Sequence, residues 1–371
     1  MRILIAPDKF KGTLTGPEAA AAMAEGALRV YPDAVVTALP IADGGEGTVE
    51  AAVAAGFSER LDSVVGPILK PVGAVWGFRE DSKVAVIETA QASGYLLSEP
   101  TVENSLRAHS YGSGQLVAAA LDAGAVEIII GLGGSAMTDG GTGALRALGL
   151  KLHDANGNLV PLGGGSLVDV VSVDTAGLDP RLAAVKVRMA VDVDNPLHGP
   201  NGAAHVFGPQ KGADAQAVEL LDAGLRNLAA VVQSSMGIDI NIAGAGAAGG
   251  FPSMFVACAD ATVERGFDLV AALIDLDTHL DDADLVITGE GSLDVQSLSG
   301  KGPLGVADAA HERGIPVVVV AGRITVTAEQ LAEHGVVSAV SATDVAGSGE
   351  AALADAAKYT TLATSEALNG I

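Results

Sequence analysis

Cysteine, aromatic residues and positive charge are all scarce in this chain of 371 residues. The single cysteine, Cys258, excludes an intramolecular disulfide and suits a reducing compartment, and no histidine or second cysteine stands at the spacing of a zinc site. Lys and Arg number 21 against 45 Asp and Glu, so the net charge of −24 repels nucleic acid and anionic membranes. A polyanionic substrate would therefore need local lysines and a divalent cation.

Long apolar segments are missing as well. The N-terminus enters a strand-like segment at residues 2–6 without the apolar core of a signal peptide, and no later stretch of about 18 apolar residues would span a membrane. Together with the lone cysteine, this pattern predicts a cytoplasmic protein that has neither a membrane nor a nucleic acid as a partner.

Short aliphatic strands that alternate with helical segments are abundant, and glycine accounts for 48 residues. The strand–loop–helix rhythm of the two chain ends predicts parallel strands with helical crossovers, whereas runs broken by Gly and Pro predict mixed strands between them. We therefore expect an α/β protein of two domains. Residues 1–57 and 282–371 form one discontinuous domain, and residues 58–281 form an inserted mixed α/β domain.

The stretch VEIIIGLGGSAMTDGGTG at residues 126–143 joins an aliphatic run to a glycine-rich segment. Its β-branched start predicts a buried strand that opens into a loop containing Gly131, Gly133 and Gly134. Glycines bring backbone N–H groups close to a ligand, and a helix from about residue 142 would add a positive dipole, so phosphate suits the loop. Ser135 could donate its hydroxyl group. A tight turn without a ligand is the alternative interpretation.

Acidic and lysine side chains follow several predicted strands near the chain ends. They comprise Asp8, Lys9 and Lys11 after the first strand, Asp43 in ADGGEGT after the second, and Glu290, Asp294 and Lys301 around Gly291 after LVIT. Ligands of open α/β sheets bind at the carboxyl ends of strands, so Glu290 and Asp294 are candidates for Mg²⁺ and the lysines for phosphate. Helix caps and solvated salt bridges are the structural alternatives.

The middle of the chain contributes two further acidic residues and a lysine. Asp192 and Asp194 alternate in a predicted strand, VKVRMAVDVDNPLHG, which would place both on one face and suit a shared metal ion or a base beside a metal ligand. Lys211 lies beside a glycine in GPQKGA. A turn cap by Asp194 and a solvated Lys211 are the simpler interpretations.

A G-x-G-x-x-G spacing at Gly244, Gly246 and Gly249 raises a different function, an oxidoreductase that uses NAD(P). The context argues against a dinucleotide fold. Pro252 falls inside the helix that should follow, and no clean second strand delivers an acidic residue about twenty positions later.

Six blocks, in order along the chain, resemble the signatures of the bacterial glycerate kinase family, the group that includes the glycerate 2-kinases. They are APDKFKGTLT (6–15), PIADGGEGT (40–48), GLGGSAMTDGG (131–141), DVDNPLHGPNGAAHVFGPQKGA (192–213), GAGAAGG (244–250) and DLVITGEGSLDVQSLSGKGP (284–303). The chain departs from the family where GGSATND is common, because it has Met137 and Thr138, and where APDSFK is common, because it has Lys9.

The resemblance implies ATP-dependent phosphorylation of D-glycerate with Mg²⁺, by a flavodoxin-like domain built from both chain ends and a second mixed α/β domain. On this basis we expect the active site in the cleft between the domains. The resemblance favours 2-phosphoglycerate as the product, and 3-phosphoglycerate is the second choice. A small-molecule kinase of another type stays an alternative, and the sequence leaves a homodimer open.

Phosphoryl transfer needs positioning and charge neutralisation, and each candidate residue has a place in such a site. We assign catalytic roles to Asp43, Asp192, Lys211 and Lys301, with Asp43 or Asp192 as the proton acceptor. Glycerate binding falls to Asp8, Lys9, Lys11 and Ser135. The nucleotide lies along Gly131, Gly133, Gly134, Gly244, Gly246, Gly249 and Gly291, and Asp194, Glu290 and Asp294 hold the metal.

Overall fold

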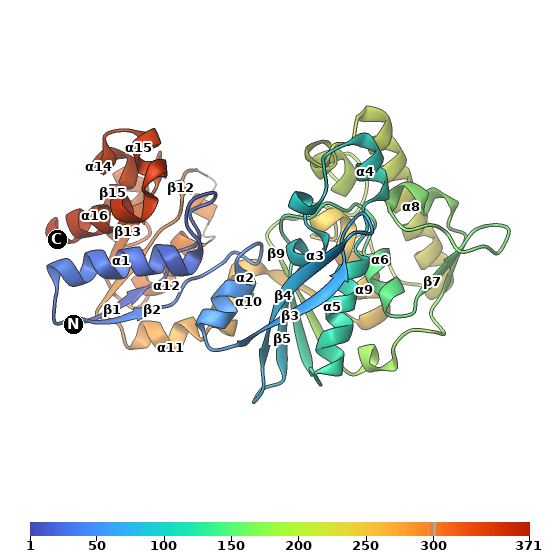
Figure 1. Cartoon of the computed structure of the whole chain (residues 1–371), viewed down its shortest axis with the longest axis horizontal. Coiled ribbons are helices and arrows are strands. Elements are labelled where there is room, and N and C mark those ends of the chain that lie inside the picture. The colour runs from blue at the N-terminus through green and yellow to red at the C-terminus, as the bar shows by residue number, and fades with distance from the viewer. Residues whose placement is uncertain (296, 300–301) are drawn as a thin grey trace. The chain divides into compact units, whose positions relative to one another are not determined.

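The computed structural model shown in Figure 1 describes residues 1–295, 297–299 and 302–371. It divides into two compact units. The terminal unit contains Met1–Asp43, Glu50–Gly56 and Phe267–Ile371, and the central unit contains Gly44–Val49 and Phe57–Gly266. The second boundary falls before Phe267 instead of after residue 281, because apolar residues of the intervening helices, such as Val270 and Leu280, belong to the core of the terminal unit.

The terminal unit is built on a sheet of five parallel strands in the order β15-β13-β11-β1-β2. Numbered within this sheet, the order is 2-1-3-4-5. Ile3 of β1 pairs with Val36 of β2 on one side and with Leu285 of β11 on the other, so the two chain ends share one sheet. The strands are β1 (Arg2–Ile5), β2 (Val35–Ala38), β11 (Leu285–Thr288), β13 (Val317–Ala321) and β15 (Val336–Ser341).

Helices cover both faces of this sheet, which therefore has two separate apolar cores. Met23 of α1 and Ala363 of α16 belong to one core, and Val270 of α10 and Leu304 of α12 belong to the other. The helices that lie wholly or partly in this unit are α1 (Gly16–Val30), α2 (Thr48–Ala54), α10 (Gly266–Leu273), α11 (Leu276–Asp281), α12 (Pro303–His311), α13 (Ala328–Ala332), α14 (Ala342–Ala346), α15 (Gly349–Ala354) and α16 (Ala356–Asn369), with a 3-10 turn η5 (Ser297–Ser299) and a short parallel pair, β12 (Ser292–Leu293) and β14 (Arg323–Ile324).

The central unit contains a six-stranded mixed sheet in the order β10-β9-β6-β5-β4-β3. The β3–β4 and β4–β5 pairs are antiparallel and the other three pairs are parallel, so the predicted α/β fold with parallel and mixed strands is confirmed. The strands are β3 (Ser58–Val65), β4 (Pro71–Arg79), β5 (Val84–Glu88), β6 (Glu127–Gly131), β9 (Lys186–Val191) and β10 (Thr262–Arg265).

Helices and 3-10 turns of the central unit enclose a core that includes Trp76, Phe78, Phe251 and Phe255. They are α3 (Thr89–Ser93), η1 (Tyr95–Leu97), α4 (Val102–Arg107), α5 (Tyr111–Asp122), α6 (Thr142–Ala147), η2 (Gly164–Asp169), η3 (Pro180–Ala183), α7 (Ala203–Phe207), η4 (Pro209–Lys211), α8 (Ala215–Met236) and α9 (Ala247–Ala259), with an antiparallel pair of β7 (Lys151–His153) and β8 (Ser172–Asp174).

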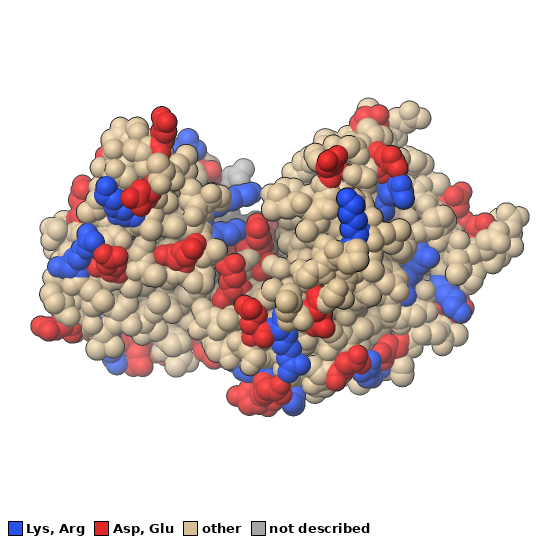
Figure 2. All heavy atoms as spheres, in the orientation of Figure 1, with Lys and Arg blue, Asp and Glu red and all other residues tan. Residues whose placement is uncertain are grey.

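Charge on the face drawn in Figure 2 is mixed, with acidic and basic side chains interspersed among the described residues and no broad basic area. Every helix in the described part of the chain is too short or too polar to cross a bilayer.

Alanine in place of glycine usually stabilises a helix, and Gly26 of α1 is a residue at which we expect the opposite. An alanine Cβ there would lie 2.5 Å from the carbonyl oxygen of Thr361 and 2.6 Å from the Cβ of Thr364, because α1 and α16 pack closely. We expect Gly26→Ala to lower the free energy of unfolding by about 1–3 kcal/mol through overpacking, although alanine is the better helix former. Urea unfolding measures the change.

Gly349, at the start of α15, is the matched control, because a Cβ there meets nothing within 4 Å. Gly349→Ala should raise the free energy of unfolding by at most about 1 kcal/mol and should not lower it. Equal effects of the two substitutions would contradict the packing described here.

Candidate active site

Three acidic residues follow neighbouring strands of the terminal sheet. Asp8 comes after β1, Asp43 after β2 and Glu290 after β11, and β1 lies between the other two strands. The backbone N–H of Asp8 donates to the carbonyl oxygen of Gly289 at 2.9 Å, which ties the end of β1 to the residue before Glu290. The carboxylates predicted at strand ends therefore gather at one edge of one sheet, as expected for parallel strands.

Burial makes two members of this acidic cluster, Asp8 and Glu290, hard to ionise. Loss of solvation raises the pKa of Asp8 to about 6, with Lys9 opposing the change and Asp43 adding to it. Loss of solvation also raises the pKa of Glu290 to about 7, and the charges of Asp8, Asp294 and Asp43 add to that effect. A divalent cation placed among these oxygens would relieve the repulsion, so the donor set fits Mg²⁺.

A hydroxyl group and a glycine shape the loop after Glu290. The Oγ of Ser297 donates to Oε1 of Glu290 at 2.6 Å and accepts the N–H of Asp294 at 3.2 Å, which draws the acidic residues of this loop together. A Cβ at Gly291 would lie 3.1 Å from the backbone nitrogen of Lys11, so this glycine permits close passage of the loop after β1.

The lysines of this region differ in their surroundings. Lys9 lies with its ammonium 3.7 Å from Oδ1 of Asp8, and its side chain is 21% exposed. Lys11 is exposed. Lys301, predicted to be catalytic, lies outside the described residues.

The three predicted metal ligands do not come from one unit. Glu290 and Asp294 belong to the terminal unit and the exposed Asp194 belongs to the central unit. Within the described ranges, no group of three or more His, Cys, Asp or Glu side chains is arranged to hold a metal ion by itself. Mg²⁺ in phosphoryl-transfer sites commonly takes one or two carboxylates and completes its shell with substrate phosphates and water, so a partial set is sufficient.

In the central unit, the glycine-rich loop after β6 packs against the segment ADGGEGT. A Cβ at Gly131 would lie 2.9 Å from the carbonyl oxygen of Gly44, and one at Gly133 would lie 2.8 Å from the Cα of Gly45. Glu88, at the end of β5, fixes the same segment, because its Oε1 accepts the N–H groups of Gly47 at 3.0 Å and Val49 at 2.7 Å. Two of the predicted glycines therefore serve close backbone packing.

The expectation that the helix after this loop offers its N-terminus to phosphate is wrong. Asp139, fully buried, accepts the N–H groups of Gly141 and Gly143 at 3.1 Å, and the Oγ of Ser110 accepts the N–H of Ala144 at 2.9 Å. Ser110 in turn donates its hydroxyl to Asp139 at 2.8 Å. A carboxylate of the protein thus takes the place that the sequence suggested for an anion.

Lys211 is buried and binds the part of the loop that contains Ser135 and Met137. Its Nζ donates to the Oγ of Ser135 at 3.1 Å and to the carbonyl oxygen of Met137 at 2.6 Å. Loss of solvation lowers the pKa of this ammonium to about 7, and the charge of Asp139 opposes the shift. Two predicted site residues, Lys211 and Ser135, therefore come together in the central unit. The simpler interpretation of Lys211 as a solvated lysine is wrong, because its side chain is buried.

The second glycine-rich segment packs against the first. The N–H of Gly140 donates to the carbonyl oxygen of Gly249 at 3.1 Å, and a Cβ at Gly249 would lie 2.0 Å from the oxygen of Met137. At Gly246 the Cβ would lie 2.3 Å from the oxygen of Pro196. Residues 237–243, directly before Gly244, form no strand, so the context that a dinucleotide fingerprint requires is missing there.

The prediction that Asp192 and Asp194 alternate on a strand is wrong. Strand β9 ends at Val191, so both residues lie in the loop that follows, where Asp194 is exposed and Oδ1 of Asp192 accepts the N–H of Gly266 at 3.3 Å. The alternating pattern continued into the loop because the residues that follow the strand keep its apolar–acidic order, whereas pairing with β6 and β10 ends at or before Val191.

Comparison with known proteins supplies the family. The sequence model of the glycerate kinase family matches residues 3–370. The chain is similar to glycerate 2-kinase of Escherichia coli K12 and to glycerate kinase of Bacillus subtilis 168, each 45% identical over 338 residues, which is 91% of this chain and 89% and 88% of those proteins. The chain belongs to the glycerate kinase family. A crystal structure of a protein assigned as glycerate kinase 2 from Salmonella typhimurium LT2 has a TM-score of 0.86 and 41% identity, and covers 99% of this chain and 96% of its own.

Three residues near the candidate site of this glycerate kinase family member were not predicted from the sequence. They are Glu88, Ser110 and Ser297. Glu88 was open to detection, because it ends a buried strand in the same way as the acidic residues that were chosen. Ser110 and Ser297 carry no sequence signal, because each acts through a hydrogen bond to a carboxylate that is not its neighbour in the chain. Ser110 donates to Asp139, and Ser297 donates to Glu290.

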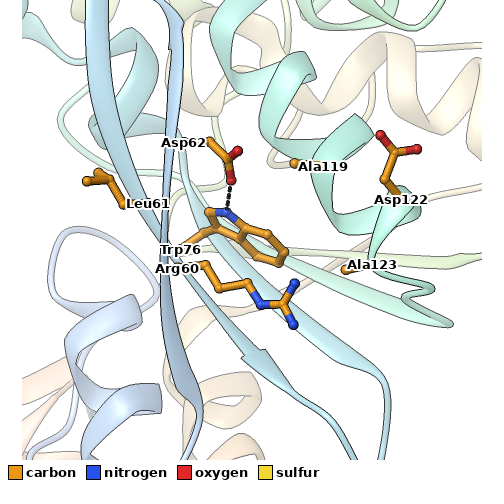
Figure 3. A pocket seen from close by; sticks show the side chains of 7 residues that line it. All are labelled: Arg60, Leu61, Asp62, Trp76, Ala119, Asp122 and Ala123. Carbon is orange, nitrogen blue, oxygen red and sulfur yellow. Dashed lines mark hydrogen bonds between the residues drawn. The ribbon is translucent and has the colours of Figure 1, made fainter.

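A surface groove of the family fold lies away from these residues. Seven residues of β3, β4, α5 and the position after α5 line its volume of about 520 Å³, namely Arg60, Leu61, Asp62, Trp76, Ala119, Asp122 and Ala123 (Figure 3). The Nε1 of Trp76 donates to Oδ2 of Asp62 at 2.7 Å, and the Arg60 guanidinium lies over the Trp76 ring. None of the predicted site residues lines this groove, so it is not the candidate active site.

The raised pKa of Glu290 predicts a pH-dependent gain in stability for Glu290→Gln. The protonated carboxyl is favoured in the folded state, so its stabilising effect is complete below the ordinary pKa of 4.5 and is lost as pH rises through about 7. Without Mg²⁺, glutamine should therefore raise the free energy of unfolding by about 2 kcal/mol at pH 8 and by much less at pH 5. Urea unfolding at the two pH values measures this difference.

Glu366, exposed on α16, provides the control. Glu366→Gln should change stability by the same small amount at both pH values. A pH-independent effect of Glu290→Gln would mean that burial does not govern the ionisation of this cluster.

Proposed function

We propose that this member of the glycerate kinase family transfers the γ-phosphoryl group of ATP to a hydroxyl of D-glycerate, giving 2-phosphoglycerate and ADP. The observation that carries the proposal is the buried ammonium of Lys211, held on a glycine-rich loop beside the Ser135 hydroxyl. Such a charge in low dielectric suits the stabilisation of a transferring phosphoryl group. The similarity to glycerate 2-kinase of Escherichia coli supports the choice of substrate and of the 2-hydroxyl.

The acidic cluster of the terminal unit is proposed to hold Mg²⁺ through Glu290, with Asp8 and Asp294 beside it. When bound, the ion neutralises charge on the phosphates. The protein contributes a rigid set of oxygens, because Ser297 fixes Glu290 and the Asp8 backbone is tied to Gly289. The exposed Asp194 of the central unit remains a weaker candidate for the same ion.

Two carboxylates suit the role of proton acceptor for the glycerate hydroxyl. Asp43 is the last residue of the first segment of the terminal unit. Asp192 directly follows β9 in the central unit. In the chain, Asp43 is followed by Gly44, where a Cβ would lie 2.6 Å from the Cβ of Ala190, two residues before Asp192. We assign the proton to one of these two and the glycerate carboxylate to Lys9 or Lys11.

The domain organisation is part of the same proposal. The 2-1-3-4-5 order of the terminal sheet is that of flavodoxin-like folds, in which ligands bind at the carboxyl ends of the strands. We infer that the acidic cluster of this flavodoxin-like domain and the Lys211 loop of the central unit serve one reaction, as the lysine and carboxylate parts of a kinase site do.

A coupled assay of ADP release with D-glycerate and Mg-ATP tests the function. Release that depends on glycerate supports it, and ADP release that is the same without glycerate would overturn it. Phosphorus NMR of the product separates 2-phosphoglycerate from 3-phosphoglycerate, because a small shift of glycerate in the site changes which hydroxyl attacks.

Lys211→Met should reduce kcat/KM for ATP by about 10²–10³-fold, the effect of removing one preorganised donor from a site. Methionine keeps most of the side-chain volume in this buried position, so circular dichroism and thermal unfolding should show a folded protein. The coupled assay measures the loss.

Lys186→Met is the matched lysine control in the same unit. Its side chain is 59% exposed and its ammonium lies 3.6 Å from Glu127, so activity should stay within about twofold of the wild type. Near-normal turnover of a folded Lys211→Met variant would remove this lysine from the reaction.

A further inference from the structure

Aromatic side chains are few in this chain, with 7 Phe, 4 Tyr and 1 Trp, and all lie in the described residues. Among them only Tyr95 has an exposed side chain, at 43% of its full surface. A fold that buries or half-buries every other ring leaves this one in solvent on the short turn η1. An exposed aromatic ring beside a loop with charged and hydroxyl groups is typical of a ligand site.

The segment that carries Tyr95 is fastened to the glycine-rich loop along its length. The N–H of Tyr95 donates to the carbonyl oxygen of Gly134 at 2.8 Å, and Gly94 forms a β-bridge with Ser135. The N–H of Ala136 donates to the oxygen of Ser93 at 2.8 Å. Tyr95 is therefore fixed in position relative to Ser135, the residue that Lys211 contacts.

The Tyr95 ring stands beside the most open point of that loop. Gly134 has a φ of +58°, and a Cβ there would lie 3.6 Å from Cε1 and 3.8 Å from Cδ1 of the ring. At Gly131 and Gly133, by contrast, backbone atoms lie within 3 Å of the corresponding position. The space over Gly134 is bounded by the ring and by Ala90 at ordinary contact distance, so the ring forms a wall next to the loop.

We propose that the Tyr95 ring is the surface on which the purine base of ATP stacks, while its phosphates extend toward Ser135 and Lys211. This inference rests on the proposed function, because it takes the loop after β6 as the phosphate end of the nucleotide site. Aromatic stacking recognises the π-face of a base and leaves its edges unread, so the residue sets nucleotide affinity more than the choice between ATP and GTP.

Calorimetric titration of ADP and of inorganic tripolyphosphate, with Mg²⁺, into Tyr95→Ala and Tyr95→Phe tests the proposal. Tyr95→Ala should weaken ADP binding about tenfold or more and leave tripolyphosphate binding unchanged, because only ADP has a base. Tyr95→Phe keeps the ring and should stay within about twofold of the wild type. In turnover, the KM for ATP should rise and the KM for glycerate should not.

Leu96→Ala is the matched control, since Leu96 is the next residue of the same turn and is 77% exposed. It should bind ADP as the wild type does. Wild-type ADP binding by Tyr95→Ala, equal losses of ADP and tripolyphosphate, or a change in the KM for glycerate alone would each overturn the stacking role. If instead the wild type fails to phosphorylate glycerate, the proposed function fails, and the ADP titrations still decide whether Tyr95 contacts a base.

Discussion

Close approach of backbone to backbone at glycine is the constraint on which the central unit depends. The loop after β6 meets the segment after Asp43 and the first residues of α9 at distances that leave no room for a Cβ, as at Gly133, Gly141 and Gly249. At Gly141 the nearest atom, the carbonyl oxygen of Phe251, would be 2.2 Å from it. These contacts bring together segments that are remote in sequence, and Lys211 and Ser135 are positioned by the result.

The two units place opposite charges in surroundings of low solvation. The sheet of the terminal unit collects acidic residues at one edge, where Asp8 is buried and Glu290 half-buried, so that ionisation of these two costs free energy in the absence of a cation. The central unit buries an ammonium instead, and compensates it only in part with the charge of Asp139. Both groups are held in states that an oppositely charged ligand would stabilise, which is how a site prepared for phosphate and a metal ion should be arranged.

Local signals in the sequence predicted local structure well. Thr15 and Glu18 have the spacing of a capping box and form one at the start of α1, and Ile128 to Ile130 form the predicted buried strand before the glycine loop. Strand ends with acidic residues also led correctly to one edge of the terminal sheet, because parallel strands repeat the same geometry. Such signals depend on neighbours in the chain, and these are visible in the sequence.

What could not be predicted depends on partners remote in the chain. Nothing near Asp139 reveals that it caps its own helix together with Ser110, and a glycine required by a distant carbonyl looks the same as one that admits phosphate. The alternation through Asp192 and Asp194 suggested a longer strand, whereas sheet pairing sets where β9 ends. The resemblance to the glycerate kinase family predicted the family that the comparison shows, but the partners of each side chain required the fold.

The sharing of one sheet by both chain ends has a consequence during translation. β1 and β2 emerge first from the ribosome, yet β1 lies between β2 and β11, and β11 begins only at Leu285. The strands of the central unit, the last of which ends at Arg265, are all synthesised before then. The β1–α1–β2 unit of the nascent chain therefore lacks its neighbouring strand β11 until the central unit has been synthesised, so the sheet of the terminal unit is completed last.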